Sequence, residues 1–74
     1  MKVKRIEYYK ELSRVTNNYI TLIRGDIVMN DYSSAYTCYC KALKIIEYYF
    51  NSYKITSCAS DYFVRRIIKS YYGW

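Results

Sequence analysis

Apolar residues recur at alternating steps of three and four along most of this chain, and this spacing is typical of amphipathic helices. The pattern is unbroken in the middle of the sequence, where one helix face would carry Tyr32, Ala35, Tyr39, Ala42, Ile46, Tyr49 and Tyr53. No segment alternates with a period of two over a useful length, although residues 19–29, rich in Tyr and Ile, would suit a strand best. We therefore expect an all-α fold.

The first two helices are predicted from their apolar faces and their caps. The first covers residues 3–24 and ends at Gly25, because glycine often follows a helix C-terminus. Its apolar face is formed by Tyr8, Leu12, Val15, Tyr19 and Leu22. The second covers residues 31–53, with Asn30 or Asp31 as its N-cap. At 1.5 Å per residue it would be about 34 Å long, so we expect it to be the central element.

The third helix is shorter and is predicted over residues 62–72, with Gly73 as its stop. Residues 56–61 are expected to form the turn before it, with Ser57, Ser60 or Asp61 as the N-cap. Its apolar face is formed by Phe63, Val64, Ile67, Ile68 and Tyr71. A chain of 74 residues has room for one domain, so we expect a single antiparallel three-helix bundle with a long central helix.

Tyrosine is in large excess, with 12 residues against two Phe and one Trp. A buried hydroxyl without a partner costs roughly 1–3 kcal/mol, whereas at a surface the same ring offers rigid contact area. Several tyrosines should therefore lie at an interface, unless the codon bias of an AT-rich genome explains the excess. Tyr48, opposite the apolar face of the second helix, and Tyr36 are the best candidates. Ile6 and Ile20, off the apolar face of the first helix, would mark a docking patch or a weak homodimer.

The charge of the chain favours acidic partners. Twelve Lys and Arg residues against six Asp and Glu give a formal net charge of +6. Residues 1–25 carry six basic and two acidic residues, residues 55–74 carry three and one, and the middle is balanced. An acidic protein surface, nucleic acid or an anionic membrane would each complement this charge.

Two rows of basic residues are the candidate binding sites. On the third helix, cations and aromatic rings alternate on the face opposite the apolar one, and phosphates and bases favour that pairing. This row is Tyr62, Arg65, Arg66, Lys69 and Tyr72, with Trp74 beside it. A second basic row on the first helix is formed by Lys10, Arg14 and Arg24, together with Asn17 and Thr21. Either row would also suit an ordinary solvated face. If both rows lie on the same side of the bundle, the case for an acidic partner is stronger.

Catalytic, cofactor and metal sites are not expected. The chain has no histidine, and its acidic residues are too few and too dispersed to form an evident catalytic pair. Cys38 and Cys40 on one helix would point about 160° apart, so they cannot chelate one metal unaided. We interpret Cys38, Cys40 and Cys58 as reduced packing thiols of a cytosolic protein. No signal peptide and no apolar run long enough to span a bilayer is evident.

One stretch of the sequence resembles a known helical family. The residues are Asp31-Tyr32-Ser33-Ser34-Ala35, followed by Tyr39, Ala42 and Leu43. They resemble the second helix of a tetratricopeptide hairpin, in which small residues let helices approach and an aromatic fills the gap. The same signature occurs in the microtubule-interacting and transport (MIT) domain, a free-standing three-helix module. The segment 62–66, Tyr-Phe-Val-Arg-Arg, is similar to a pattern in its third helix. The resemblance implies a peptide-binding groove, and the lack of a second copy 34 residues away excludes a repeat array.

The leading functional hypothesis is a small, non-enzymatic helical module that binds another protein. Brevity, basicity and the lack of motifs suggest an adaptor, or an inhibitor of a host complex that a virus or mobile element encodes. The alternative is a nucleic-acid-binding protein, including a component of a ribonucleoprotein particle. Binding to a membrane surface ranks lower, because the basic faces lack bulky aliphatic neighbours.

Overall fold

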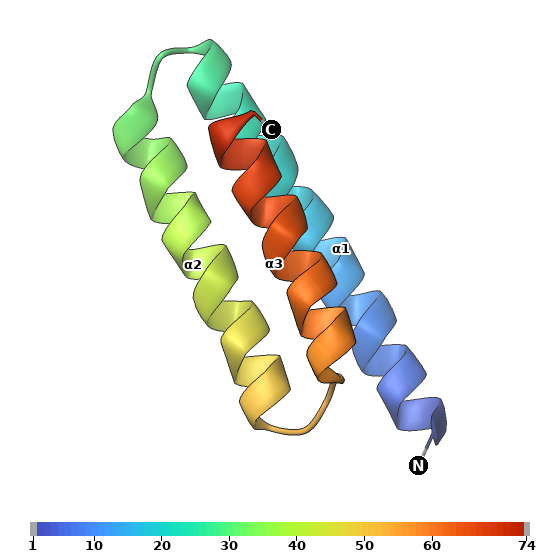
Figure 1. The fold of residues 1–74 in the computed structure, drawn as a ribbon. Helices are drawn as coiled ribbons and strands as arrows, with labels where there is room; N and C mark the ends of the chain where they lie inside the picture. Colours follow the sequence, from blue (N-terminus) through green and yellow to red (C-terminus); the bar gives the residue numbers. More distant parts are fainter. Residues whose placement is uncertain (1, 74) are drawn as a thin grey trace.

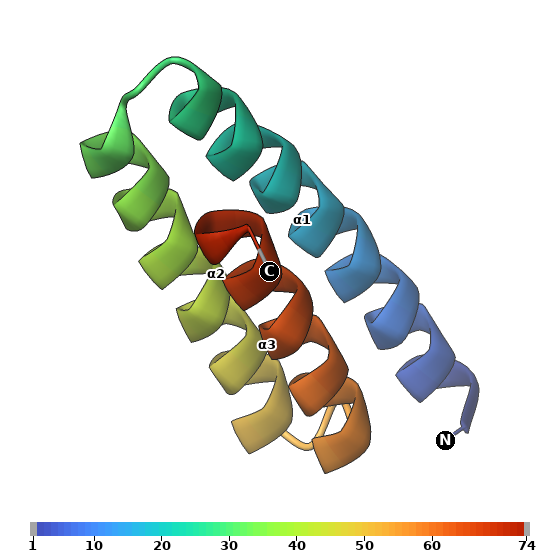
Figure 2. The same ribbon diagram turned by 45° about the horizontal axis from the view of Figure 1, so that its top comes forward.

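The computed structural model describes residues 2–73, with side chains for residues 6–73, and this part of the chain is three helices (Figure 1). They are α1 (Lys2–Val28), α2 (Tyr32–Asn51) and α3 (Ser57–Tyr72). Each helix packs against the other two, and α3 returns antiparallel to α2 alongside both partners (Figures 1 and 2). The prediction of an all-α three-helix bundle is confirmed. The second helix was expected to be the long one; instead α1 has 27 residues and α2 has 20.

The core is formed by one stripe from each helix and by the connection before α3. Its buried apolar residues are Leu12, Ile23, Ala35, Ala42, Ile46, Tyr49, Ile55, Phe63 and Ile67. The expected apolar face of α2 is confirmed in its middle, where Ala35 and Ala42 are almost fully buried. Two small side chains on one face let α1 and α3 approach α2 closely. At the two ends of this face, Tyr32 and Tyr53 are exposed. Tyr32 is the first residue of α2, and Tyr53 lies beyond its last residue.

The buried face of α1 differs from the expected one. Leu22 is 52% exposed, whereas Thr16 and Ile23 are buried. An α-helix has 3.6 residues per turn, so a contact face tracked at a strict 3.5-residue spacing drifts by about 20° per heptad. Measured from buried Leu12 at about 100° per residue, Leu22 lies about 80° away around the helix and Ile23 only about 20° away, so Ile23 takes the buried position. The same drift brings Ile20 against the core, so that of the two suggested docking residues only Ile6 is exposed.

The connection between α1 and α2 explains why α1 does not stop at Gly25. The chain leaves α1 at Asn30, whose φ of 61° is left-handed. The Asn30 amide donates to the Ile27 carbonyl (3.0 Å) and the Asp31 amide to the Asp26 carbonyl (2.8 Å), which is the Schellman pattern. Gly25 therefore lies inside the helix, and the predicted stop is wrong. Asp31 is confirmed as the N-cap of α2, because its carboxylate accepts the Ser34 amide hydrogen (3.2 Å).

The connection between α2 and α3 is also shorter than expected. Helix α2 ends at Asn51, and Tyr53 takes the left-handed conformation with φ of 59°. Helix α3 begins at Ser57, because the Thr56 hydroxyl accepts the Ala59 amide hydrogen (3.2 Å) and so caps it. The predicted turn over residues 56–61 and its three candidate caps are wrong. Gly73, with φ of 75°, ends α3 as predicted, and its amide donates to the Lys69 carbonyl (2.8 Å).

These helix ends make opposite predictions for two glycines. Gly25→Ala should raise the free energy of unfolding by about 0.5–1 kcal/mol, since alanine is the better helix former. Apart from the neighbouring backbone of α1 itself, no atom of the described residues lies within 4 Å of the added Cβ. Gly73→Ala should lower it by about 1 kcal/mol, because alanine disfavours the left-handed conformation. Urea unfolding measures both. A loss of stability in Gly25→Ala would mean that α1 ends at Gly25 after all.

Candidate interaction surfaces

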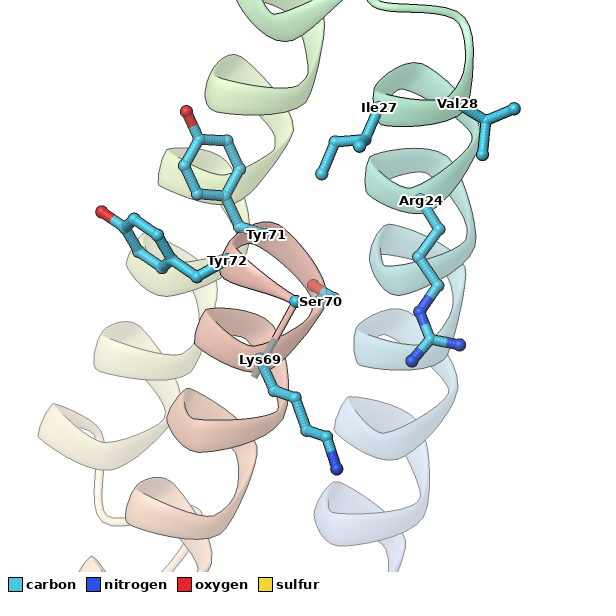
Figure 3. A pocket seen from close by; sticks show the side chains of 8 residues that line it. Arg24, Ile27, Val28, Lys69, Ser70, Tyr71 and Tyr72 are labelled. Atoms are coloured by element: carbon cyan, nitrogen blue, oxygen red, sulfur yellow. The ribbon is translucent and has the colours of Figure 1, made fainter.

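Basic side chains from two helices meet between α1 and α3. A hollow of about 490 Å³ lies beside the last turns of both helices (Figure 3). A second hollow of about 300 Å³ adjoins it, and Arg24 and Lys69 line both. Figure 3 shows these two side chains with their charged ends on the same side of the structure, while the rings of Tyr71 and Tyr72 are turned away from them. The second hollow is completed by Ile20, Tyr62 and Arg66.

Arg66 is held in place at this junction. Its Nη2 donates to Oδ1 of Asn17 (2.7 Å), and its guanidinium lies 5.7 Å from the centre of the Tyr62 ring. Asn17 belongs to the basic row of α1, between Arg14 and Arg24. The contact therefore places Arg66 of the α3 row on the same side of the bundle as the basic row of α1. We call Lys10, Arg14, Arg24, Arg66 and Lys69 the basic face.

The basic face keeps a net positive charge. Among the described residues that line the two hollows, three are cations and none is acidic. Both helices end here, and each C-terminus contributes roughly half a negative charge. That amount offsets only about one of the three cations. Lys69 also lies in the last turn of α3, where a cation stabilises the helix, so part of its role is local.

Arg65 is not part of this arrangement. Its Nε lies 3.2 Å from a carboxylate oxygen of Asp61, one turn earlier on α3. Both side chains are mostly exposed, and such pairs contribute about 0–1 kcal/mol. Arg66 and Lys69 line the second hollow, whereas Arg65 is not among its described lining residues. The cationic row expected on α3 is therefore divided, and the α1 side chain that joins Arg66 and Lys69 is Arg24.

Four tyrosines pack together between α2 and α3, and we call them the tyrosine cluster: Tyr36, Tyr39, Tyr71 and Tyr72. The rings of Tyr39 and Tyr71 are stacked at 4.7 Å, and Tyr72 packs edge-on against both. Tyr36 lies 6.1 Å from each of the two stacked rings. A hydrogen bond to the Cys40 side chain raises the pKa of Tyr36, and burial raises the pKa of Tyr39. Tyr36 and Tyr72 remain more than half exposed.

Tyr48 is not part of the tyrosine cluster and lies beside Tyr49 and Lys54 instead. With Tyr8 and Tyr49 it surrounds the ammonium group of Lys54, and we call these three rings the tyrosine cage. The Tyr49 hydroxyl donates to Oε1 of Glu11 (2.5 Å). Burial, and then this hydrogen bond, raise the pKa of Tyr49 to about 12. The sequence offered no signal for the cage, because Lys54 reaches it only through the left-handed turn at Tyr53.

Of the remaining site predictions, Tyr62 lies half-exposed on the second hollow, with its ring against Phe63 as well as Arg66. Trp74 lies outside the described residues.

The three cysteines are free thiols. No group of three or more metal-ligating side chains occurs in the part of the chain that the structure describes. Over the same residues, no helix combines the length and apolarity that crossing a membrane requires.

No family model matches this chain, and neither the curated proteins nor the solved structures include a significant match. The likeness to tetratricopeptide and MIT helices therefore stays a prediction from sequence. Any functional proposal depends on the geometry of the surfaces described above.

The Tyr49 hydroxyl predicts a stability change at high pH. The pKa of Tyr49 is raised from 10.0 to about 12 in the folded protein, so its contribution to stability is complete below about pH 10. It is lost as the pH rises towards 12, because the unfolded chain releases that proton more easily. Urea unfolding across this range should show a steeper loss for the wild type than for Tyr49→Phe. Tyr53→Phe, which alters an exposed tyrosine, is the control and should follow the wild type. Equal slopes for all three proteins would contradict the assignment.

Proposed function

We propose that this protein is a small, non-enzymatic helical module that binds an acidic protein partner through the basic face. The observation that carries the proposal is the convergence of Arg24, Arg66 and Lys69 from two helices. They line adjoining hollows whose described lining residues include no carboxylate. A surface of this kind attracts and orients a negatively charged partner.

The chemistry of the face suits carboxylates. A guanidinium presents a planar fork of donors that can bind a carboxylate through two parallel hydrogen bonds. Arg66 is already positioned by Asn17 and by the Tyr62 ring, so less side-chain freedom is lost when it binds. Along α1 the row from Lys10 to Arg24 extends over about 21 Å at 1.5 Å per residue. That length would support an extended segment or a helix of about three to four turns.

The biological setting that we favour is an adaptor, or an inhibitor of a host complex encoded by a virus or mobile element. The proposal includes a reducing intracellular compartment, because Cys38, Cys40 and Cys58 are free thiols. A non-enzymatic role agrees with the composition, since histidine is missing from the sequence.

Nucleic-acid binding is the second candidate, and one observation favours it. Tyr62 is half-exposed beside Arg66 in a hollow that Arg24 and Lys69 also line. An accessible ring among cations is the arrangement on which unpaired bases stack while the cations contact phosphates.

A charge-matched pair of variants tests the proposal. Arg24→Ala/Arg66→Ala/Lys69→Ala removes three cations from the basic face. Lys41→Ala/Lys44→Ala/Arg65→Ala removes the same charge from exposed positions elsewhere. Fluorescence anisotropy with a labelled oligoglutamate peptide should show at least a tenfold loss of affinity for the first variant and a small loss for the second. Equal losses would mean that only net charge matters, and the proposed site would be wrong.

The same two variants separate the candidates. If nucleic acid is the ligand, labelled oligodeoxythymidine should bind more tightly than the peptide at equal salt. The first variant should then flatten the slope of log K against log salt by about 2–3 units, close to one per lost phosphate contact. Tighter binding of the peptide than of the oligonucleotide would favour the acidic protein partner.

A further inference from the structure

The side chain of Lys54 is partly buried, and its ammonium group lies against three aromatic rings. Its Nζ lies 4.8 Å from the centre of the Tyr8 ring, 5.1 Å from Tyr48 and 5.4 Å from Tyr49. All three distances fall within the roughly 6 Å over which a ring attracts a cation. Tyr49 packs edge-on against both other rings, at 6.4 Å from Tyr8 and 5.9 Å from Tyr48. The three rings therefore form one connected wall around the ammonium group.

The backbone of the α2–α3 connection delivers Lys54 into this position. The Lys54 amide donates to the Tyr49 carbonyl (2.9 Å) and the Tyr53 amide to the Phe50 carbonyl (3.0 Å), which is the Schellman pattern. In that motif the residue after the left-handed one usually makes an apolar contact with the last turn of the helix. Here the contact is made by the Lys54 ammonium on the Tyr49 ring. The left-handed residue is Tyr53, a bulky side chain for which this conformation is unfavourable.

The rings come from two helices and are fixed by the fold. Tyr8 belongs to α1, and Tyr48 and Tyr49 belong to α2. Tyr49 is buried and is held by its hydrogen bond to Glu11 of α1. The Glu11 carboxylate also adds a negative charge beside the cage. Tyr48, in contrast, is 58% exposed, so one side of the cage borders solvent.

From this arrangement we infer that the tyrosine cage is an ammonium-binding site whose resident ligand is Lys54. Removal of the Lys54 charge frees the cage for a methylated ammonium group from outside. Aromatic cages of two to three rings recognise methylated amines through the same attraction between a cation and ring faces. Because Lys54 is tethered, its effective concentration at the cage is about millimolar or higher. A free ammonium ion at lower concentration therefore does not displace it.

The first experiment tests the resident ligand. Lys54→Met keeps the length and apolar stem of the side chain but removes its charge, whereas Lys54→Arg keeps a cation. Lys54→Met should lower the melting temperature by about 4–8 °C, and Lys54→Arg should lower it by less than half of that. The matched control is Lys44→Met, on the exposed face of α2, which should remain within about 2 °C of the wild type. Equal melting of Lys54→Met and Lys44→Met would overturn the inference.

The second experiment tests the site directly with tetramethylammonium chloride. In proton NMR titrations, Lys54→Ala should show saturable shifts of the tyrosine ring signals with a Kd of about millimolar order, because the rings are then unoccupied. The wild type should need more tetramethylammonium for the same shift, with an apparent Kd at least about twofold higher, because the tethered Lys54 competes for the rings. The double variant Lys54→Ala/Tyr48→Ala should also lose the response, and sodium chloride at equal concentration controls for ionic strength. No saturable shift in Lys54→Ala, or the same response in the wild type, would overturn the inference.

This inference does not depend on the proposed function. The cage residues differ from the residues of the basic face, and neither experiment uses an acidic probe. A protein that ignores oligoglutamate but binds tetramethylammonium in the Lys54→Ala form would contradict the proposed function alone. The reverse pattern would contradict only the cage.

Discussion

Contacts between tyrosine rings on different helices hold the two ends of this bundle. At one end the tyrosine cluster joins the first half of α2 to the last turn of α3. At the other end the tyrosine cage joins the start of α1 to the end of α2 and to the connection that follows. Between the ends the core is mainly aliphatic, with Phe63 as its largest fully buried side chain. In a chain of 74 residues an aliphatic core alone leaves little stability, so these ring contacts matter for the whole fold.

This packing also changes the meaning of the tyrosine excess. A tyrosine ring can contact other rings while its hydroxyl stays near water or donates to a side chain, as Tyr49 does to Glu11. Tyr48 and Tyr72 combine substantial exposure with contacts to neighbouring rings. From the composition alone, such residues are candidates for a partner interface. Their contacts within the chain give them a structural role first, and leave only their exposed sides for a partner.

Much of the fold could be predicted from the sequence, because local chemistry specifies it. The apolar face of α2, the N-cap at Asp31 and the stop at Gly73 depend on residues close in sequence. The errors arose where local signals compete. Helix α1 ends at left-handed Asn30 and not at Gly25. The Thr56 hydroxyl caps α3, so this helix starts at Ser57, inside the segment that was expected to be a turn. The basic face was predictable only in part, since the meeting of Arg66 with Asn17 depends on how two helices pack. The cage was not predictable, because it requires a left-handed Tyr53.

Binding of an acidic partner to the basic face can be tested by mapping where a bound acidic probe contacts the protein. NMR of the labelled protein can follow the side-chain Nε–Hε signals of individual arginines during titration with oligoglutamate. We expect the Arg24 and Arg66 signals to shift together and saturate, whereas the signal of Arg65, which pairs with Asp61 and is not among the described residues that line the hollows, should shift little. Uniform small shifts of all arginines, or the largest shifts at Arg65, would contradict this expectation.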